Sequence, residues 1–145
     1  MNITSDIHLH IVSFDIPYPA NYGGVIDVFF RIKSLAERGV KIHLHCFEYG
    51  REHSEYLEKF CYSVNYYQRE MKITHLLNHL PYIVCSRHSK ELCDNLKKDD
   101  YPILLEGLHC CSVLLDEEFQ KRNVLVSAHN VEHEYYEHLN KAEKD

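Results

Sequence analysis

The sequence of 145 residues lacks any apolar run that approaches the roughly 18 residues of a membrane-spanning helix. Residues 1–6 also lack the basic start and apolar stretch of a secretory signal. We therefore expect a protein that is cytoplasmic or peripheral to the inner membrane face. A basic patch is absent as well, and 16 Lys+Arg against 22 Asp+Glu give a formal net charge of −6. Such a charge repels nucleic acid, so we expect no nucleic-acid partner.

Cysteine pairs of the C-x-x-C type are also missing, although the chain has six cysteines. This spacing fits buried free thiols better than a disulfide or zinc framework. The composition is otherwise that of a globular protein, with 45% hydrophobic and 26% charged residues. The unusual count is that of histidine, at twelve, which raises the question of a metal site.

Hydrophobic periodicity predicts strands that alternate with helices along the whole chain. The first unit is the clearest: a strand over 7–14, a helix over 25–36 that stops at Gly39, and a strand over 40–47. The later strands are expected at 63–67, 101–105 and 123–128. The later helices are expected at 52–60, 71–80, 89–96 with Ser86 or Ser89 as its cap, 108–119, and from 131 onward.

This alternation predicts a single α/β domain over residues 1–145. Strands connected in this way form a parallel sheet with right-handed crossovers. The expected architecture is an open, doubly wound, Rossmann-like sheet of about five or six strands. Ligands of such sheets bind at the carboxyl ends of the strands, so the residues that follow each strand are the candidate site residues.

The first candidate is the loop over 17–24, which ends in Gly23 and Gly24 before a helix. Two glycines allow close approach of the backbone, and the start of a helix presents free N–H groups to an anion such as phosphate. The loop matches neither G-x-G-x-x-G nor a P-loop. The alternative is a plain tight turn.

The second candidate is Glu106 with His109, directly after the strand over 101–105. Either side chain is suited to bind a sugar hydroxyl or to move a proton. The alternative is that Glu106 only stabilises the start of the following helix through the helix dipole.

The third candidate is the polar cluster that begins at His129, with Asn130 placed to cap the next helix. His129, Glu132 and His133 spell H-x-x-E-H, which formally matches a zinc-protease motif. That motif needs both histidines on one helix and a further ligand, whereas His129 here leaves a strand. A zinc hydrolase is therefore a third, less favoured hypothesis, and His133 and His138 are expected to be solvated.

The fourth candidate consists of two H-x-H runs, His8 with His10 and His43 with His45. Alternation along a strand places each pair on one face of neighbouring strands, where a four-histidine metal cluster is conceivable. A site in the middle of the sheet lies away from the expected crevice, however. We favour hydrogen-bonded, partly buried histidines, and we expect no metal.

Four segments together resemble the N-terminal domain of a family-four glycosyltransferase with the GT-B fold. These segments are 10–24 (HIVSFDIPYPANYGG), 35–42 (LAERGVKI), 106–109 (EGLH) and 129–136 (HNVEHEYY). Their order and their positions at strand exits span nearly the whole chain. The resemblance implies a retaining hexosyltransferase in which two Rossmann-like domains face each other across a cleft, with no metal or other cofactor required.

The resemblance also assigns roles to residues. His129 is expected to be catalytic and to face the transferred sugar, and Gly23 and Gly24 to lie near the donor diphosphate. The residues implied on the acceptor side are Asn21, Tyr22, Glu106, His109, Asn130 and Glu132. The expected partners are a nucleotide-sugar donor and a glycan or glycoconjugate acceptor, as in the synthesis of a surface polysaccharide.

Two departures from the family qualify this interpretation. The nucleotide-binding C-terminal domain is absent from the 145 residues, so we expect the isolated domain to be inactive, because much of the charge that stabilises a leaving diphosphate is missing. We also expect weak self-association as a dimer, through apolar surface that the second domain covers. The second departure is Ser127, which stands where a basic residue is expected.

The alternative function is a free-standing α/β module that binds a phosphorylated small molecule.

Overall fold

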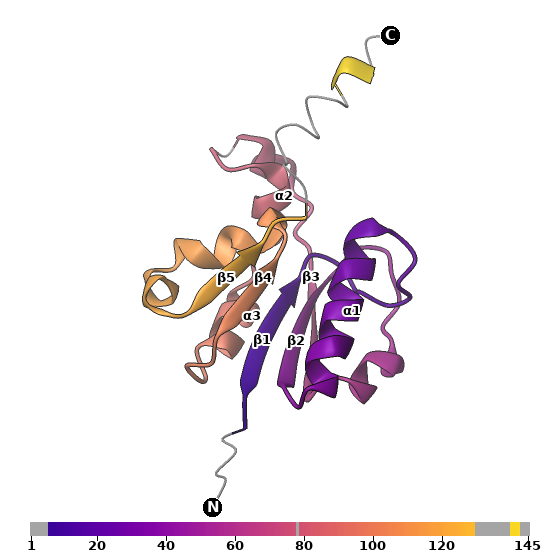
Figure 1. The fold of residues 1–145 in the computed structure, drawn as a ribbon. Helices are drawn as coiled ribbons and strands as arrows, with labels where there is room; N and C mark the ends of the chain where they lie inside the picture. The colour runs from indigo at the N-terminus through magenta and orange to yellow at the C-terminus, as the bar shows by residue number, and fades with distance from the viewer. Residues whose placement is uncertain (1–5, 78, 130–139, 143–145) are drawn as a thin grey trace, which may run out of the picture.

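The computed structural model describes residues 6–77, 79–129 and 140–142 and contains one parallel β-sheet (Figure 1). The strand order is β3-β2-β1-β4-β5, and every neighbouring pair is parallel. The strands are β1 (His8–Ser13), β2 (Lys41–Glu48), β3 (Ser63–Gln68), β4 (Ile103–Glu106) and β5 (Val124–Ser127). The predicted open, Rossmann-like α/β sheet is confirmed.

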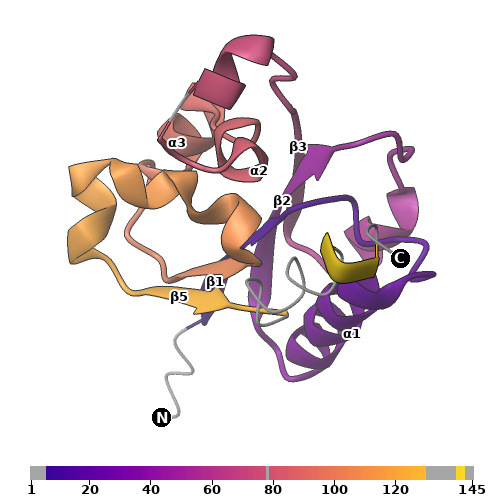
Figure 2. The ribbon, with the colours of Figure 1, turned by 90° about the horizontal axis from the view of Figure 1, so that it is seen from above.

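Helix α1 (Gly23–Glu37) covers one face of this sheet (Figure 2). Its buried residues recur at helical spacing, and they are Val25, Val28, Phe29 and Ile32. The helix ends where Gly39 adopts a positive φ of 86° and its N–H donates to Ala36 O at 2.9 Å. A side chain is strained in that conformation, so glycine provides the predicted stop.

The two faces of the sheet carry separate hydrophobic cores. The core under α1 includes Ile11, Ile42, Leu44 and Cys46 from the strands and Leu57 from the segment after β2. The core on the opposite face is built on Val12, Phe47, Tyr67, Ile103 and Leu105, and it is closed by Leu92, Cys93, Leu96, Cys110, Val113 and Phe119. Alternate residues of each strand thus enter different cores, as expected for a sheet covered on both sides.

The opposite face is covered by short helical segments. Helix α3 (Lys90–Leu96) begins at Ser89, whose Oγ accepts a hydrogen bond from Leu92 N at 3.2 Å, so Ser89 and not Ser86 is the cap. Helix α2 (Tyr82–Cys85) lies above the carboxyl ends of the strands (Figure 1). The sequence did not predict α2, which falls just after Pro81 and has only four residues.

Three of the predicted helices are wrong in type or length. The expected helix over 52–60 is a 3₁₀ turn at Glu55–Lys59, preceded by extended backbone at Ser54, and the one over 71–80 is a 3₁₀ turn at Ile73–Leu77. The expected helix over 108–119 is two 3₁₀ segments, Leu108–Leu115 and Glu117–Lys121. Asp116 separates them because its backbone is extended and its Oδ1 accepts from Glu118 N at 3.1 Å, which starts a new turn.

Other expectations concern the thiols and the membrane. All six cysteines are free, and burial raises the pKa of the Cys46 and Cys110 thiols. The prediction of free thiols is therefore confirmed. In the part of the chain that the structure describes, no helix is long and apolar enough to cross a membrane. The expected helix from 131 onward falls on 130–139, outside the described residues.

Candidate functional site

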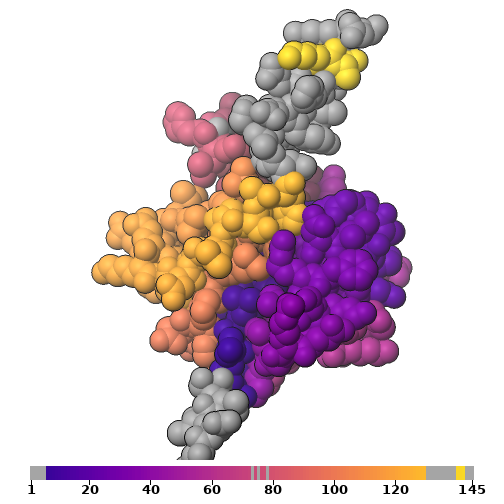
Figure 3. Space-filling view, viewed as in Figure 1, coloured from indigo at the N-terminus to yellow at the C-terminus, as the bar shows by residue number. Residues whose placement is uncertain are grey.

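The strand exits form one row at the upper edge of the sheet in Figure 1. Ser13 of β1 pairs in register with Glu106 of β4, and Glu106 pairs with Ser127 of β5. Phe14, Gly107 and His129 therefore follow these strands at the same edge. In the space-filling view, α1 (violet) and the chain around β5 (orange) lie against each other across the front face (Figure 3). A cavity of about 430 Å³ lies between them, lined by Gly23, Gly24, Ile26, Asp27 and His129.

Glu106 is the buried centre of this edge, with no exposed surface. One carboxylate oxygen, Oε2, accepts a hydrogen bond from His129 Nε2 at 2.9 Å, and the other, Oε1, accepts from Arg31 Nη1 on α1. The carboxylate therefore requires the proton of His129 on Nε2. The other ring nitrogen, Nδ1, lies 3.5 Å from Asp27 Oδ2 in the cavity wall. The hydrogen bond to Glu106 thus holds the imidazole at the cavity, and the Asp27 carboxylate lies on the other side of the ring.

Phe14 occupies the middle of the edge. Its ring centroid lies 5.7 Å from that of His129 and 5.4 Å from that of His109, so the two imidazoles contact the same phenyl ring. Phe14 also packs closely against the glycine loop. A Cβ atom added to Gly24 would lie only 2.6 Å from Phe14 Cζ. The Phe14 ring thus lies between two parts of the sheet edge. One part contains Glu106 and His129, and the other contains His109.

Gly24→Ala should destabilise the fold by about 1–3 kcal/mol, since its methyl group displaces a ring held between two histidines. Gly23→Ala is the matched control, because a Cβ there meets nothing within 4 Å. It should leave the free energy of unfolding unchanged or raise it by up to about 1 kcal/mol. Urea unfolding of the two variants measures the difference, and equal stabilities would contradict the contact.

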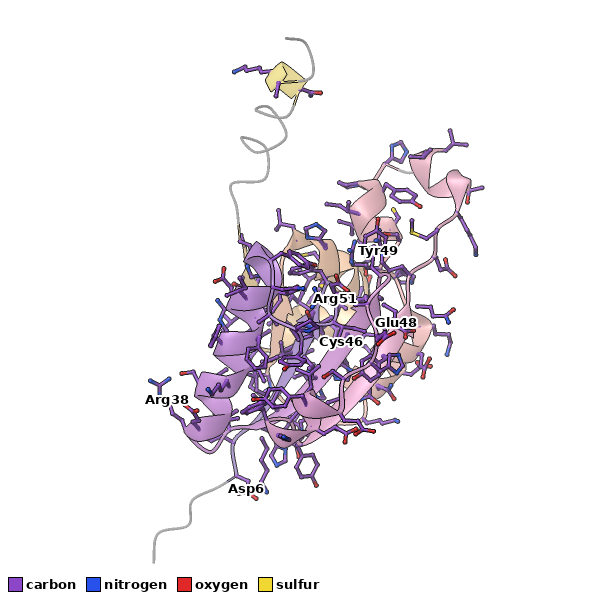
Figure 4. All side chains as sticks on the ribbon, turned by 90° about the vertical axis from the view of Figure 1, so that its right-hand side faces the viewer. Asp6, Arg38, Cys46, Glu48, Tyr49 and Arg51 are labelled. Atoms are coloured by element: carbon purple, nitrogen blue, oxygen red, sulfur yellow. The ribbon has the colours of Figure 1, made fainter. Side chains whose placement is uncertain are left out.

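Asn21 and Tyr22, expected on the acceptor side, lie in the loop before α1. The Tyr22 hydroxyl donates to Asp15 Oδ2 at 2.7 Å, and burial together with this carboxylate raises the pKa of Tyr22 to about 12. Asn21 Oδ1 accepts from Arg51 Nη1 at 3.0 Å, and the Arg51 guanidinium lies 5.3 Å from the Tyr22 ring. Arg51 and Tyr49 follow the upper end of β2 (Figure 4). The loop is thereby tied to a third strand exit.

His109 lies in the first turn of the segment after β4. Burial lowers its pKa to about 4, and the nearby positive charges of Arg87 and Arg69 act in the same direction. The buried Nδ1 atom of this ring has no hydrogen-bond partner. His109 is thus a neutral imidazole beside two arginines.

The structure therefore brings together Gly23, Gly24, Glu106, His109 and His129 around Phe14. Asn130 and Glu132 lie outside the described residues, as does His133, so the acceptor roles of the first two and the H-x-x-E-H hypothesis stay predictions. Sequence reasoning missed Phe14, Asp27, Arg31, Arg69 and Arg87. The predicted strand over 7–14 includes Phe14 as its last residue, whereas β1 ends at Ser13, so that Phe14 lies at the strand exit.

The four histidines of the H-x-H runs form hydrogen-bonded pairs across β1 and β2. His8 Nδ1 lies 2.8 Å from His43 Nε2, and His10 Nδ1 lies 2.9 Å from His45 Nε2. Within the described residues, no group of three or more His, Cys, Asp or Glu side chains is arranged to hold a metal ion. The favoured interpretation as hydrogen-bonded, partly buried histidines is confirmed.

The inner pair belongs to a chain of hydrogen bonds with a fixed direction. Asp99 Oδ1 lies 2.8 Å from His10 Nε2, so this nitrogen donates and His10 Nδ1 accepts from His45 Nε2. His45 Nδ1 then accepts from the Tyr67 hydroxyl at 2.8 Å, whose oxygen accepts from Asn95 Nδ2 at 2.8 Å. Each imidazole is neutral and has one defined tautomer.

Comparison with known proteins gives one informative relative. No family model matches the chain, and no solved structure matches it. Over 136 residues, the chain is 34% identical to the "Uncharacterized 44.6 kDa protein in cps region" of Klebsiella pneumoniae, an alignment that covers 89% of this chain. The chain spans 35% of the length of that relative. The protein is thus a parallel α/β domain homologous to part of a protein from a cps region.

Proposed function

We propose that the chain is the N-terminal, acceptor-side domain of a retaining glycosyltransferase with the GT-B fold, which builds a surface polysaccharide. The observation that carries the proposal is the cavity shared by the start of α1 and His129, with Glu106 behind it. The cps region of the relative supports a role in polysaccharide synthesis. The relative is also long enough to contain a second domain of similar size.

The start of α1 supplies the donor side of this site. The first N–H groups of an α-helix have no partner within the helix, and Gly23 and Gly24 contribute two of them at the cavity wall. Those groups and the positive end of the helix dipole suit the diphosphate of a nucleotide sugar. The second domain supplies the remaining contacts to the nucleotide in this proposal.

His129 supplies the contact to the transferred sugar. Its Nε2 is held by Glu106, and its ring forms part of the cavity wall beside the glycines. A sugar whose diphosphate lies at Gly23 and Gly24 is therefore within reach of this imidazole. Glu106 has both oxygens engaged and no exposed surface, so it acts as a positioning residue for His129. No step in this proposal requires a metal.

The experiment uses the complete protein encoded by the reading frame that contains these residues. It is incubated with a panel of nucleotide sugars and with glycan acceptors, and release of nucleoside diphosphate and glycosylated product is measured. His129→Ala should lower the rate at least about 100-fold, since it removes the group that contacts the sugar. His88→Ala, at an exposed histidine, is the control and should leave the rate unchanged.

The outcomes separate the alternatives. A complete protein that transfers no sugar from any donor, or a His129→Ala variant with an unchanged rate, would overturn the proposal. Tight binding of a sugar phosphate by the 145-residue chain, without any transfer by the complete protein, would instead favour the free-standing binding module.

A further inference from the structure

A basic group lies at the sheet edge on the His109 side of Phe14. It consists of Arg69, which directly follows β3, Arg87, which follows α2, and His109. Arg87 Nε donates to Phe14 O at 3.0 Å. The three side chains are therefore connected to the sheet edge at Phe14, the residue whose ring lies between His129 and His109. Two arginines and an imidazole gather here in a chain with a formal net charge of −6.

Arg87 is the most unusual member, because it is an arginine residue with only 5% of its surface exposed. Its hydrogen bonds go to the neutral carbonyls of Phe14 and Ile83, both at 3.0 Å. Across residues 6–77 and 79–129, no carboxylate forms an ion pair with it. Asp15 is near enough to stabilise its charge, but the Asp15 oxygens are bonded to Ile16 N and the Tyr22 hydroxyl. Buried charges in proteins are normally paired, so this one is short of an anion.

Arg69 and His109 add further unused hydrogen-bonding groups. Arg69 Nη2 donates to Ser86 Oγ at 3.0 Å, while its buried Nε has no partner. The buried Nδ1 of His109 has none either. Burial and the neighbouring Arg69 charge lower the pKa of Arg87 to about 10, as expected for two like charges brought together without an anion between them.

Contacts from neighbouring segments hold Arg69 and the backbone at Arg87 in place. Ser112 Oγ donates to Arg87 O at 2.9 Å, and Glu70 N donates to Ser86 O at 2.9 Å. The Arg69 guanidinium also lies 4.1 Å from the Tyr49 ring at the end of β2. These contacts hold the backbone carbonyls of Ser86 and Arg87 and the guanidinium of Arg69. The planar arrays of N–H donors on the two guanidinium groups match the oxygens of phosphate.

We propose that Arg69, Arg87 and His109 form a subsite for a phosphate or diphosphate group carried by the acceptor. This inference rests on the proposed transferase function, which places the donor diphosphate at Gly23 and Gly24, on the other side of Phe14. The acceptor is then a phosphorylated glycan carrier and not a neutral sugar. The subsite binds the phosphate group, whether a lipid or a soluble molecule carries it.

The test measures binding to the 145-residue chain by calorimetry, with inorganic pyrophosphate and farnesyl diphosphate as probes. Arg69→Gln should weaken the affinity for a probe at least tenfold, and Arg87→Gln should do the same if it folds. Arg69 is partly exposed, so its variant keeps the test valid if the Arg87 variant unfolds. Arg38→Gln is the control, because Arg38 lies at the far end of α1 (Figure 4), and its affinity should be unchanged.

Each outcome decides the inference. Equal losses of affinity for both probes support the subsite and show that it recognises the phosphate group itself. If pyrophosphate does not bind and the variant loses affinity for farnesyl diphosphate, the subsite is supported and the phosphate group that it binds is lipid-linked. If Gly24→Ala weakens binding and Arg69→Gln does not, the anion belongs to the donor loop and the inference is overturned. No binding of either probe also overturns it.

The same variants separate this inference from the proposed function. If Arg69→Gln leaves the acceptor KM of the complete protein unchanged while His129→Ala abolishes transfer, only the subsite fails. If pyrophosphate binding depends on Arg69 but the complete protein transfers no sugar, the anion site stands and the transferase proposal fails.

Discussion

Lowering the pH from 7 to 5 should reduce the free energy of unfolding of this chain by at least about 2 kcal/mol. The cause is a set of neutral histidines on strands β1 and β2. Burial lowers the pKa of His45 to about 3, and burial also lowers the pKa of His10 and of His43. The hydrogen bond to Asp99 opposes the shift of His10 without reversing it.

The direction of the effect follows from proton uptake. A histidine in the unfolded chain titrates near pH 6.5, whereas His45 in the fold stays neutral down to about pH 3. Between these values the unfolded chain binds more protons than the folded one. The free energy of unfolding is therefore at its full value above about pH 7 and decreases as the pH is lowered. At pH 5, His45 alone contributes a loss of about 2 kcal/mol, and His10 and His43 add to it.

The hydrogen-bond chain gives a structural reason for this resistance to protonation. His45 Nδ1 faces the Tyr67 hydroxyl, and His10 Nδ1 faces His45 Nε2, so both acceptor nitrogens already receive a proton donor. A proton added to His10 Nδ1 would face the N–H of His45. Protonation in the fold therefore breaks a buried hydrogen bond, which is costly where no water replaces it.

Thermal unfolding followed by circular dichroism between pH 5 and 8 measures the effect, and the midpoint should fall by about 5 °C or more. This window lies above the usual range of carboxyl groups, so the histidines dominate it. His88→Gln, at an exposed position, should leave the pH profile unchanged. A midpoint that stays constant between pH 7 and 5 would contradict the prediction.

The sheet and α1 were predictable because each depends on local periodicity that burial enforces. Alternation in 7–14 and 40–47 reflects strands with a different core on each face, and the spacing from Val25 to Ile32 reflects one buried helical stripe. The 3₁₀ segments were not predictable in the same way. Leu108–Leu115 is rich in apolar residues, but its geometry depends on Gly107 at its start and on Asp116 at its end.

Site residues were predictable where they follow a predicted strand closely in the chain. That rule found Glu106 and His129, which the register brings together although 22 residues separate them in the chain. It missed Arg31 and Asp27, because they project from the middle of α1 and only the packing of α1 on the sheet brings them to the edge. Arg69 follows β3 directly, but nothing in the sequence connects it with Arg87, which follows the unpredicted helix α2, and no basic run marks the two as one cluster.

Glu106→Gln should lower the transfer rate of the complete protein about 100- to 1000-fold, an effect on the scale of losing a general acid or base. Both oxygens of the Glu106 carboxylate accept hydrogen bonds, from Arg31 Nη1 and from His129 Nε2. A glutamine offers one oxygen and one NH₂ group, so in either orientation one of these donors faces another donor. Arg31 then loses its partner, or His129 changes tautomer and carries its proton on Nδ1 toward Asp27.

A purely structural role for Glu106 predicts something different, and two readouts separate the cases. If Glu106 acts through His129, the double variant Glu106→Gln with His129→Ala should be no slower than His129→Ala alone, because residues that work as a unit are not additive. Glu106→Gln should also shift the pH dependence of the rate. Glu52→Gln, at an exposed glutamate, should change neither. Additive losses with an unchanged pH profile would contradict this role, because the proposal connects the fully buried Glu106 carboxylate to the sugar through the imidazole of His129.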